Sequence, residues 1–412
     1  MKIEIDCDRL SRELEGLAAI SSEPAPAVTR VVFTDADLRA RVFVKHLCRD
    51  AGLAVREDAA GNTFARWSGE QPDLPPVATG SHIDAIPNAG RYDGTVGVLG
   101  GLEAIRALLR AGFRPRHSIE LIVFTSEEPT RFGIGCLGSR LMAGVLDESA
   151  GRRLVDRDGI SLDSARAGAG FTGRLSAVRL PSGAYSAFIE LHIEQGPLLE
   201  ERQIDLGVVT AIAAPATLRV WVEGQGGHAG AVLMPDRRDA FLAAAEIALA
   251  VEAAARSTGA LDTVATTGVC DVFPGAVNSI PSRVRLEIDA RDVDLARRDA
   301  VLQKISEAAQ AVATRRRVTV RSETLNADAP AQCATDVIAA LVQACETHGF
   351  SSDLMISRAY HDCLFMSRIA PAAMLFTPCR AGISHRPDEY ASPEAIARGA
   401  LVLAEALIRL AQ

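Results

Sequence analysis

Short apolar runs alternate with helical patterns along roughly the first 210 residues. The run at 76–81 predicts a buried strand that ends at His82, and the run at 119–125 predicts another that ends just before Glu127. A helix is expected after each strand, over 97–109 and 135–143. This alternation is typical of an α/β sheet covered by helices. Such sheets place their functional sites at the C-terminal ends of the strands, where the polar residues are found here.

The pattern changes between about residues 212 and 326. There it predicts a strand, a long helix, two strands, a second long helix and a final strand, over 217–223, 238–256, 262–271, 283–289, 293–313 and 317–322. A unit of about 115 residues can form its own core. The α/β pattern resumes after Asn326. We therefore predict an α/β domain built from 1–211 plus 327–412, interrupted by an α+β domain at 212–326.

Composition and charge narrow the class of protein. The chain has 412 residues, 48% of them hydrophobic, which excludes a disordered or collagen-like chain. Lys and Arg number 44 against 52 Asp and Glu, for a net charge of −8, which argues against nucleic-acid or anionic-membrane partners. No uncharged run approaches the ~20 residues that span a bilayer, and the N-terminus lacks the apolar stretch of a signal peptide. Eight cysteines without CxxC spacing suggest buried free thiols and a cytoplasmic location.

Histidines and carboxylates in Gly-rich polar segments are the candidate chemistry. Four histidines stand in such segments: His82, His192, His228 and His385. Their carboxylate neighbours are Asp84, Asp93, Glu127 and Glu128. Three imidazoles with one bridging and one terminal carboxylate could hold two divalent cations that activate water. Of the adjacent glutamates, one could bind metal while the other accepts a water proton; the alternative is a solvated loop pair.

The order of these motifs carries a family resemblance. The chain reads HID at 82–84, DG at 93–94, EE at 127–128, HIEQGP at 192–197, GGHAG at 226–230 and SH at 384–385. This series resembles the M20-type dinuclear metallohydrolases, and within them the branch of N-carbamoyl-L-amino acid, allantoate and ureidoglycolate amidohydrolases. The resemblance implies a metal-dependent exopeptidase-like catalytic domain whose inserted domain is a lid and forms a homodimer. Peptidase members generally lack HIEQGP, which counts against a peptidase.

The resemblance also implies a role for each candidate residue. His82, Asp93 and His192 would hold one metal, and Asp93 would bridge to a second metal held by Glu128 and His385. Glu127 would be the general base, His228 would stabilise the oxyanion, and the carboxylate of Asp84 would orient His82. The substrate contacts would be Gln195, Asn278, Arg291 and His361. Mn²⁺ is the expected cation, with Zn²⁺, Co²⁺ or Ni²⁺ as alternatives. For Arg291, the alternative is a structural pair with Asp289 or Asp292.

Two segments depart from the carbamoylase pattern. Where those enzymes usually read GAGHDA, this chain reads SRAYHDC, with Arg358 and Tyr360, and Arg380 stands near His385. Bulkier, more basic residues suggest a small anionic ureido substrate. These strings resemble the ureidoglycolate amidohydrolases, which implies hydrolysis of ureidoglycolate to glyoxylate, ammonia and carbon dioxide. The alternatives are an N-carbamoyl-L-amino acid hydrolase, a β-ureidopropionase or an allantoate amidohydrolase. A catalytically dead binding protein is disfavoured because every ligand and the base are present.

Overall fold

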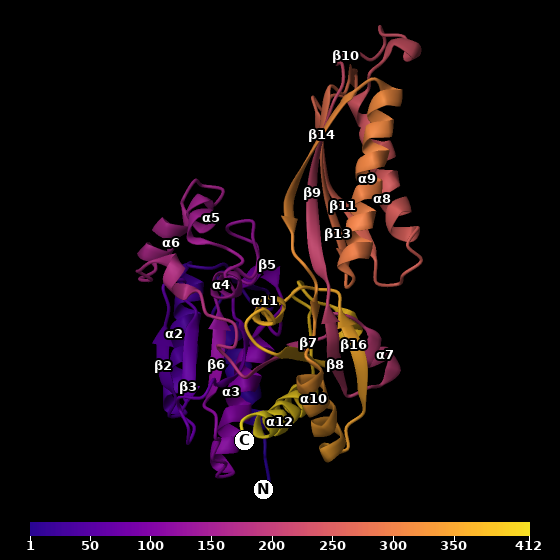
Figure 1. The fold of residues 1–412 in the computed structure, drawn as a ribbon. Coiled ribbons are helices and arrows are strands. Elements are labelled where there is room, and N and C mark those ends of the chain that lie inside the picture. The colour runs from indigo at the N-terminus through magenta and orange to yellow at the C-terminus, as the bar shows by residue number, and fades with distance from the viewer. The chain divides into compact units, whose positions relative to one another are not determined.

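The chain divides into two compact units in the computed structural model, which describes residues 1–412 (Figure 1). The first unit consists of Met1–Thr210, Gln332–Ser357 and His361–Gln412. The second consists of Ala211–Ala331 and the short segment Arg358–Tyr360. The chain therefore leaves the first unit twice, once for a long excursion and once for the three residues between Ser357 and His361.

A nine-stranded sheet organises the first unit. Its strand order is β15-β8-β17-β7-β4-β6-β3-β2, with β16 paired to β8. The four central strands run parallel: β17 (Ala372–Thr377), β7 (Ala187–Ile193), β4 (Val77–His82) and β6 (Ile119–Phe124). Every residue of these four strands is buried, as expected for a sheet covered on both faces. The outer strands are β2 (Ala54–Glu57), β3 (Thr63–Trp67), β8 (Leu206–Ile212), β15 (Ala331–Gln332) and β16 (Ser352–Ser357).

Two groups of helices pack against this sheet. In the first group, α3 (Thr95–Arg110) packs on β4 and β7 and on α12 (Pro393–Leu410), which also contacts α1 (Cys7–Ala18) and α10 (Thr335–His348). In the second, α4 (Leu137–Met142) and α11 (Asp362–Met366) pack together, and α2 (Asp35–Asp50) contacts β2 and β3. The remaining elements are β1 (Val28–Arg30), β5 (Ala85–Ala89), α5 (Glu148–Arg153), α6 (Leu162–Gly168) and α7 (Leu198–Arg202).

The second unit is an antiparallel sheet with two helices on one face. The strand order is β11-β13-β9-β14, and alternate residues of β13, such as Val284 and Leu286, pack against the helices. The intervening residues, such as Arg285 and Glu287, lie on the other face. The strands are β9 (Ala214–Glu223), β11 (Val264–Phe273), β13 (Arg283–Asp292) and β14 (Thr319–Ala327); the helices are α8 (Ala240–Arg256) and α9 (Leu295–Arg316). Beyond one end of this sheet, β10 (Gly227–His228) pairs with β12 (Ser279–Ile280).

The observed elements agree with the sequence patterns in most places. The predicted strands at 76–81 and 119–125 lie within one residue of β4 and β6, and the six elements expected between 217 and 322 are all present. Strand β7 was not predicted, because Glu190 and His192 interrupt its apolar pattern. All eight cysteines are free, but the expectation of buried thiols is wrong for Cys270, which lies exposed on the edge strand β11. None of the helices combines the length and the apolar character needed to cross a membrane.

Candidate metal centre and active site

The predicted ligands from the sheet of the first unit lie at the C-terminal ends of its neighbouring strands. His82 is the last residue of β4, and His192 lies near the end of the parallel neighbour β7. Glu127 and Glu128 follow β6, which is parallel to β4 on its other side. Asp93 precedes Gly94, the residue that caps the start of α3; Gly94 has φ +67°, and a Cβ there would lie 2.4 Å from His82 Nε2. A side chain at position 94 would therefore displace a ligand, which explains the glycine of the DG motif.

Two sets of donor atoms share Asp93. In the first set, Asp93 Oδ1 lies 3.1 Å from His192 Nε2 and 3.6 Å from His82 Nε2. In the second, Asp93 Oδ2 lies 3.1 Å from His385 Nε2, which is 3.2 Å from Glu128 Oε1. The donor atoms of each set lie within 4.8 Å of one another. The two oxygens of one carboxylate therefore face different sets, as the predicted bridging role requires.

The donor chemistry fits two divalent cations. Nitrogen and carboxylate oxygen bind Zn²⁺ at about 2.0–2.2 Å, so two donors of one tetrahedral ion are ~3.4 Å apart, close to the separations found here. Mixed imidazole and carboxylate donors also suit other first-row divalent ions. The residues that would hold the cations are therefore present and already close together.

Hydrogen bonds to backbone carbonyls fix which ring nitrogen of His82 and His192 is free to bind a metal. His82 Nδ1 lies 3.0 Å from the carbonyl oxygen of Asp84, and His192 Nδ1 lies 2.9 Å from that of Ile193. A carbonyl oxygen only accepts, so each Nδ1 carries a proton and donates it. In the neutral rings, the lone pair is then on Nε2, the atom that faces Asp93.

The electrostatics of the site favour positive charge at the imidazoles. Burial lowers the pKa of His82, but the charges of Glu127 and Asp93 outweigh it and raise that pKa well above its ordinary value. Hydrogen bonds to Asp93 and Glu128 raise the pKa of His385 to about 11. Burial raises the pKa of Asp93, yet hydrogen bonds from the histidines hold it well below its usual range. The carboxylates thus stabilise positive charge where the cations would bind.

Glu127 lies beside the donor sets and belongs to neither. Its Oε2 is 3.8 Å from His82 Nε2, and its Oε1 accepts from the Cys136 thiol at 3.6 Å. Burial raises the pKa of Glu127 well above its ordinary value, and the neighbouring charge of Glu128 adds to this. A buried carboxylate next to two cation positions has the place that a general base needs.

Asp84 contacts both His82 and the two adjacent glutamates. The carboxylate of Asp84 was expected to orient His82, but its Oδ1 is 3.7 Å from Nδ1, farther than the carbonyl oxygen of the same residue. The two carboxylate oxygens instead accept the backbone N–H groups of Glu127 and Glu128 at 3.1 and 3.0 Å. The short HID turn aims the backbone carbonyl at the ring, so the hydrogen bond comes from there, and the orienting role of the carboxylate stays a prediction. Asp84 therefore orients the two glutamates.

Gln195 and His361, predicted as substrate contacts, lie close to the ligands. Gln195 Nε2 donates to Asp93 Oδ2 at 2.8 Å, and its buried Oε1 has no hydrogen-bond partner. The His361 ring is 2% exposed and its centroid is 4.5 Å from that of His192. Burial lowers the pKa of His361 well below its ordinary value, so the ring is neutral. Their predicted contacts with substrate remain predictions.

The second unit places His228 and Asn278 together, and Arg291 far from them. His228 in β10 is paired with Ser279 in β12, and the carbonyl of Asn278 accepts from the Ala229 N–H at 2.9 Å. Both are exposed. His228 Nδ1 accepts the Gly230 N–H at 3.1 Å, so the neutral ring carries its proton on Nε2, ready to donate. A donor of this kind is what a developing oxyanion needs.

Arg291 lies near the other end of β13. The strand from Arg283, which pairs with the end of β9 nearest β10, to Arg291 is about 27 Å long at ~3.4 Å per residue. Arg291 Nε donates to Asp289 Oδ1 at 2.7 Å, so the structural pair considered as an alternative is formed. Its guanidinium also lies 6.0 Å from the ring centroid of Tyr360, while Arg358 pairs with Asp262 at 2.6 Å. Asn278 and Arg291 of one chain therefore cannot bind the same carboxylate.

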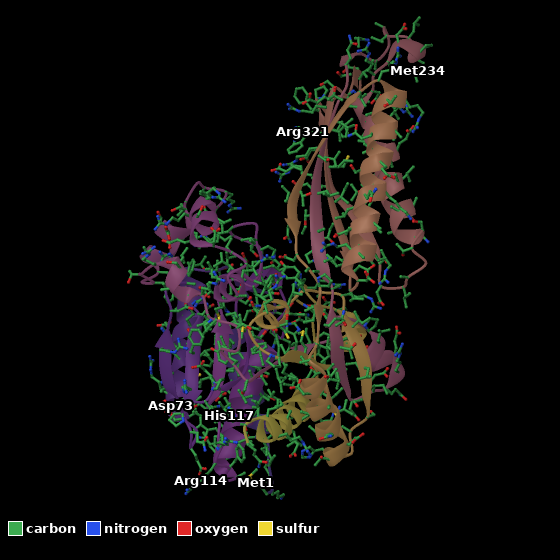
Figure 2. All side chains as sticks on the ribbon, viewed as in Figure 1. Met1, Asp73, Arg114, His117, Met234 and Arg321 are labelled. Atoms are coloured by element: carbon green, nitrogen blue, oxygen red, sulfur yellow. The ribbon has the colours of Figure 1, made fainter.

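The structure also shows two residues that sequence reasoning missed. Ser384 Oγ lies 3.0 Å from Asp93 Oδ2, and Glu389 accepts the backbone N–H of Asp93 at 3.2 Å. Both belong to the SHRPDEY string that contains His385. Neither was selected, because a serine and a glutamate next to a ligand carry no distinctive spacing. By contrast, His117 precedes β6 at the opposite end of that strand, and its Nδ1 lies 2.7 Å from the carbonyl oxygen of Pro75 (Figure 2).

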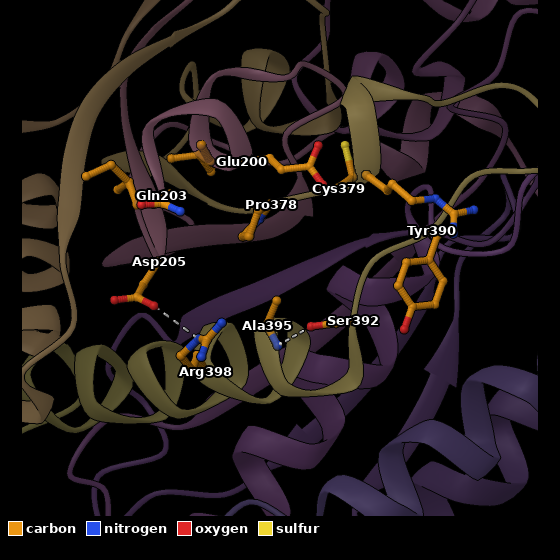
Figure 3. A pocket seen from close by; sticks show the side chains of 12 residues that line it. Glu200, Gln203, Asp205, Pro378, Cys379, Tyr390, Ser392, Ala395 and Arg398 are labelled. Atoms are coloured by element: carbon orange, nitrogen blue, oxygen red, sulfur yellow. Dashed lines mark hydrogen bonds and ion pairs between the residues drawn. The ribbon is translucent and has the colours of Figure 1, made fainter.

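A surface pocket of about 320 Å³ lies beside the segment that carries His385 (Figure 3). Its lining includes Glu200, Asp205, Cys379, Tyr390 and Arg398. Arg398 Nε is 3.5 Å from Asp205 Oδ1, as the dashed line shows. None of the metal donors lines this pocket. The pocket is therefore separate from the candidate metal centre, although residues between 378 and 392 contribute to both.

A helix-covered parallel sheet with two donor sets that share one carboxylate at its C-terminal edge is typical of metal-dependent hydrolases. The comparisons with known proteins agree: the model of Peptidase family M20/M25/M40 matches residues 78–409, and the chain belongs to this family. It is 53% identical to the ureidoglycolate hydrolase of Arabidopsis thaliana, over 99% of this chain and 87% of that protein. It is 40% identical to an N-carbamoyl-L-amino acid amidohydrolase of Geobacillus stearothermophilus, over 99% of both chains.

A solved structure supports the same relationship. The crystal structure of AtUAH in complex with glyoxylate has a TM-score of 0.91 and 52% identity to this chain, covering 99% of this chain and 98% of that one. The predictions of family, fold class and hydrolase class are therefore confirmed.

Proposed function

We propose that this chain hydrolyses the linear ureido amide of ureidoglycolate. We also propose that two divalent cations occupy its two donor sets, and Mn²⁺ is the cation that we expect. The observation that carries the substrate is the 53% identity to a ureidoglycolate hydrolase over nearly the whole chain. The complete donor sets around Asp93 and the free carboxylate of Glu127 supply the means of hydrolysis. The buried free thiols suit a reducing compartment, and we propose the cytoplasm.

The reaction needs a base, an oxyanion donor and a carboxylate clamp. Cations bound by the donor sets would activate water and polarise the ureido carbonyl. Glu127 takes a proton from the attacking water and returns it to the terminal nitrogen as the C–N bond breaks, which releases ammonia. The carbamate that remains loses carbon dioxide, and the resulting aminoalcohol breaks down to a second ammonia and glyoxylate. His228 donates Nε2–H to the oxygen on which charge develops.

Two subunits are needed to supply His228 and Arg291 to one substrate. The two residues belong to the same compact unit and are separated by the length of β13, about 27 Å, whereas ureidoglycolate is only a few ångströms long. Movement of the unit as a rigid body leaves that distance unchanged. If Arg291 holds the carboxylate in its own subunit, His228 and the adjacent Asn278 must come from the partner. We therefore propose a homodimer with sites that combine residues of both chains.

The edge formed by β11 and α8 fits the interface of such a dimer. Leu249 of α8 is 67% exposed, and Phe241, Val264 and Phe273 are also exposed large apolar residues on these two elements. Strand β11 is an edge strand, so its backbone groups can pair with the same strand of a second copy. The opposite edge, β14, carries charged residues such as Arg321 and Glu323 and is less suited to burial.

Ammonia release from candidate substrates tests the proposed function. We expect the Mn²⁺-loaded protein to release ammonia from ureidoglycolate with a higher kcat/KM than from allantoate, N-carbamoyl-L-amino acids or N-carbamoyl-β-alanine. Chelation should abolish the release, and added Mn²⁺ should restore it. A clear preference for an N-carbamoyl-L-amino acid would contradict the proposed substrate and favour the relationship to the Geobacillus protein.

Replacing Arg291 with Lys tests the carboxylate clamp. A lysine keeps the charge but lacks the planar fork, so the loss of a charge-assisted contact of about 1.5–3 kcal/mol should lower kcat/KM roughly 10- to 150-fold. Arg285→Lys is the matched control, because Arg285 lies on the same face of β13 and also donates to a carboxylate, that of Asp271 on the neighbouring strand. If both variants kept the wild-type kcat/KM, Arg291 would be only a structural partner of Asp289.

A further inference from the structure

The carboxylate of Glu389 connects two loops that are far apart in the sequence. Its Oε1 accepts the backbone N–H groups of Tyr92 and Asp93 at 2.7 and 3.2 Å, and its Oε2 accepts the hydroxyl of Ser384 at 2.8 Å. Glu389 and Tyr92 are separated by 297 positions in the chain. The residue is 4% exposed, so these contacts are the ones that compensate for burying a charge.

The two loops carry donors that the sheet does not hold. His82 on β4 is paired with Phe124 of β6, and His192 on β7 is paired with Phe376 of β17, so the sheet ladder fixes both backbones. Asp93 precedes α3, and His385 lies in a non-helical segment with φ 58° and a side chain that is 47% exposed. Asp93 belongs to both donor sets, but the other two donors of the first set lie on strands, whereas the second set also contains His385. The second donor set therefore depends on loop contacts more than the first set does. Glu389 is a direct connection between those two loops through Ser384, the neighbour of His385.

The backbone next to Asp93 leaves room for this carboxylate. A Cβ at Gly90 would lie 2.3 Å from Glu389 Cβ and 2.4 Å from its Oε1, so one of the two residues would have to shift. A side chain at position 90 would have to push Glu389 away from Tyr92 and Asp93. The absence of a side chain at Gly90 is therefore what allows Glu389 to reach the backbone of Tyr92 and Asp93.

We propose that Glu389 is a positioning residue that holds the Asp93 and His385 loops against each other, and thereby sets the affinity of the second donor set. This inference rests on the proposed metal-dependent function. It concerns how the donors are held and is independent of which ureido compound is the substrate.

Titration of the metal-free protein with Mn²⁺ by calorimetry tests the proposal. His385→Ala identifies the second site in the wild-type binding curve. Glu389→Ala should weaken binding at that site by ~10- to 100-fold, the usual effect of losing a contact behind a ligand, with a much smaller change at the first site. Glu389→Gln should recover most of the affinity, because its amide oxygen still accepts the two backbone N–H groups. Gly90→Ala should reproduce the selective loss.

The controls separate positioning from general stability. Glu394→Ala removes an exposed carboxylate from the nearby start of α12 and should leave both sites unchanged. The proposal is overturned if Glu389→Ala leaves the second site intact, or if it weakens both sites equally while lowering the Tm of the metal-free protein. A wild-type protein that binds two Mn²⁺ but fails to hydrolyse ureidoglycolate would contradict the proposed substrate and leave the test of Glu389 valid.

Discussion

Replacing Glu127 with Gln should lower kcat for ammonia release by ~10²- to 10⁴-fold while the protein keeps both metal ions. The amide preserves the shape of the side chain but cannot accept a proton from water. Glu127 belongs to neither donor set, so its loss should not release a cation. The measurement combines steady-state kinetics with elemental analysis of the bound metal.

The neighbouring glutamate provides the matched control. Glu128 Oε1 lies 3.2 Å from His385 Nε2 and completes the second donor set, so Glu128→Gln should lose metal from that set. The roles of the two residues would be reversed if Glu127→Gln lost metal and Glu128→Gln retained two ions per subunit.

Replacing His228 with Ala should lower kcat by roughly 10²- to 10³-fold with the metals retained, the cost of removing one oxyanion donor. The Gly230 N–H fixes the tautomer of His228 and leaves Nε2–H as the donor. His228→Gln should recover part of the rate, because its amide can also donate a hydrogen bond. An unchanged kcat in His228→Ala would exclude a role in the chemical step.

Mixed dimers test whether His228 crosses between subunits. Refolding or subunit exchange of an equal mixture of His228→Ala and Glu127→Gln chains produces hybrids in half of the dimers. If His228 serves the partner's site, one site in each hybrid has both wild-type residues, and the mixture should recover roughly a quarter of the wild-type rate. If His228 acted within its own chain, no site would be complete and the mixture would be as inactive as its parents. That outcome would contradict the two-subunit site and leave the role of Arg291 in doubt, since both residues belong to one unit.

Local patterns were sufficient to predict most elements and to select the candidate metal donors. The Ala-rich run that forms α8 and the buried runs of β4 and β6 are signals that neighbouring residues carry by themselves. The candidate donors could be selected because histidines and carboxylates in Gly-rich strand ends are unusual. Strand β7 could not be predicted in the same way. Its polar residues Glu190 and His192 are buried because Ser81 and Asp93 bond to them, and both partners lie about a hundred residues away.

The sequence by itself determined which residues could hold metal, the family to which they belong and the α/β pattern that gathers them. Only the tertiary structure decided that the two oxygens of Asp93 face separate donor sets, that Glu389 joins the loops of Asp93 and His385, and that β13 separates Arg291 from Asn278. It also decided that the carbonyl of Asp84, rather than its carboxylate, bonds His82. The physical reason is the same in each case. Residue type and spacing specify what a side chain can do, whereas contacts between distant segments depend on the path of the whole chain through the sheet.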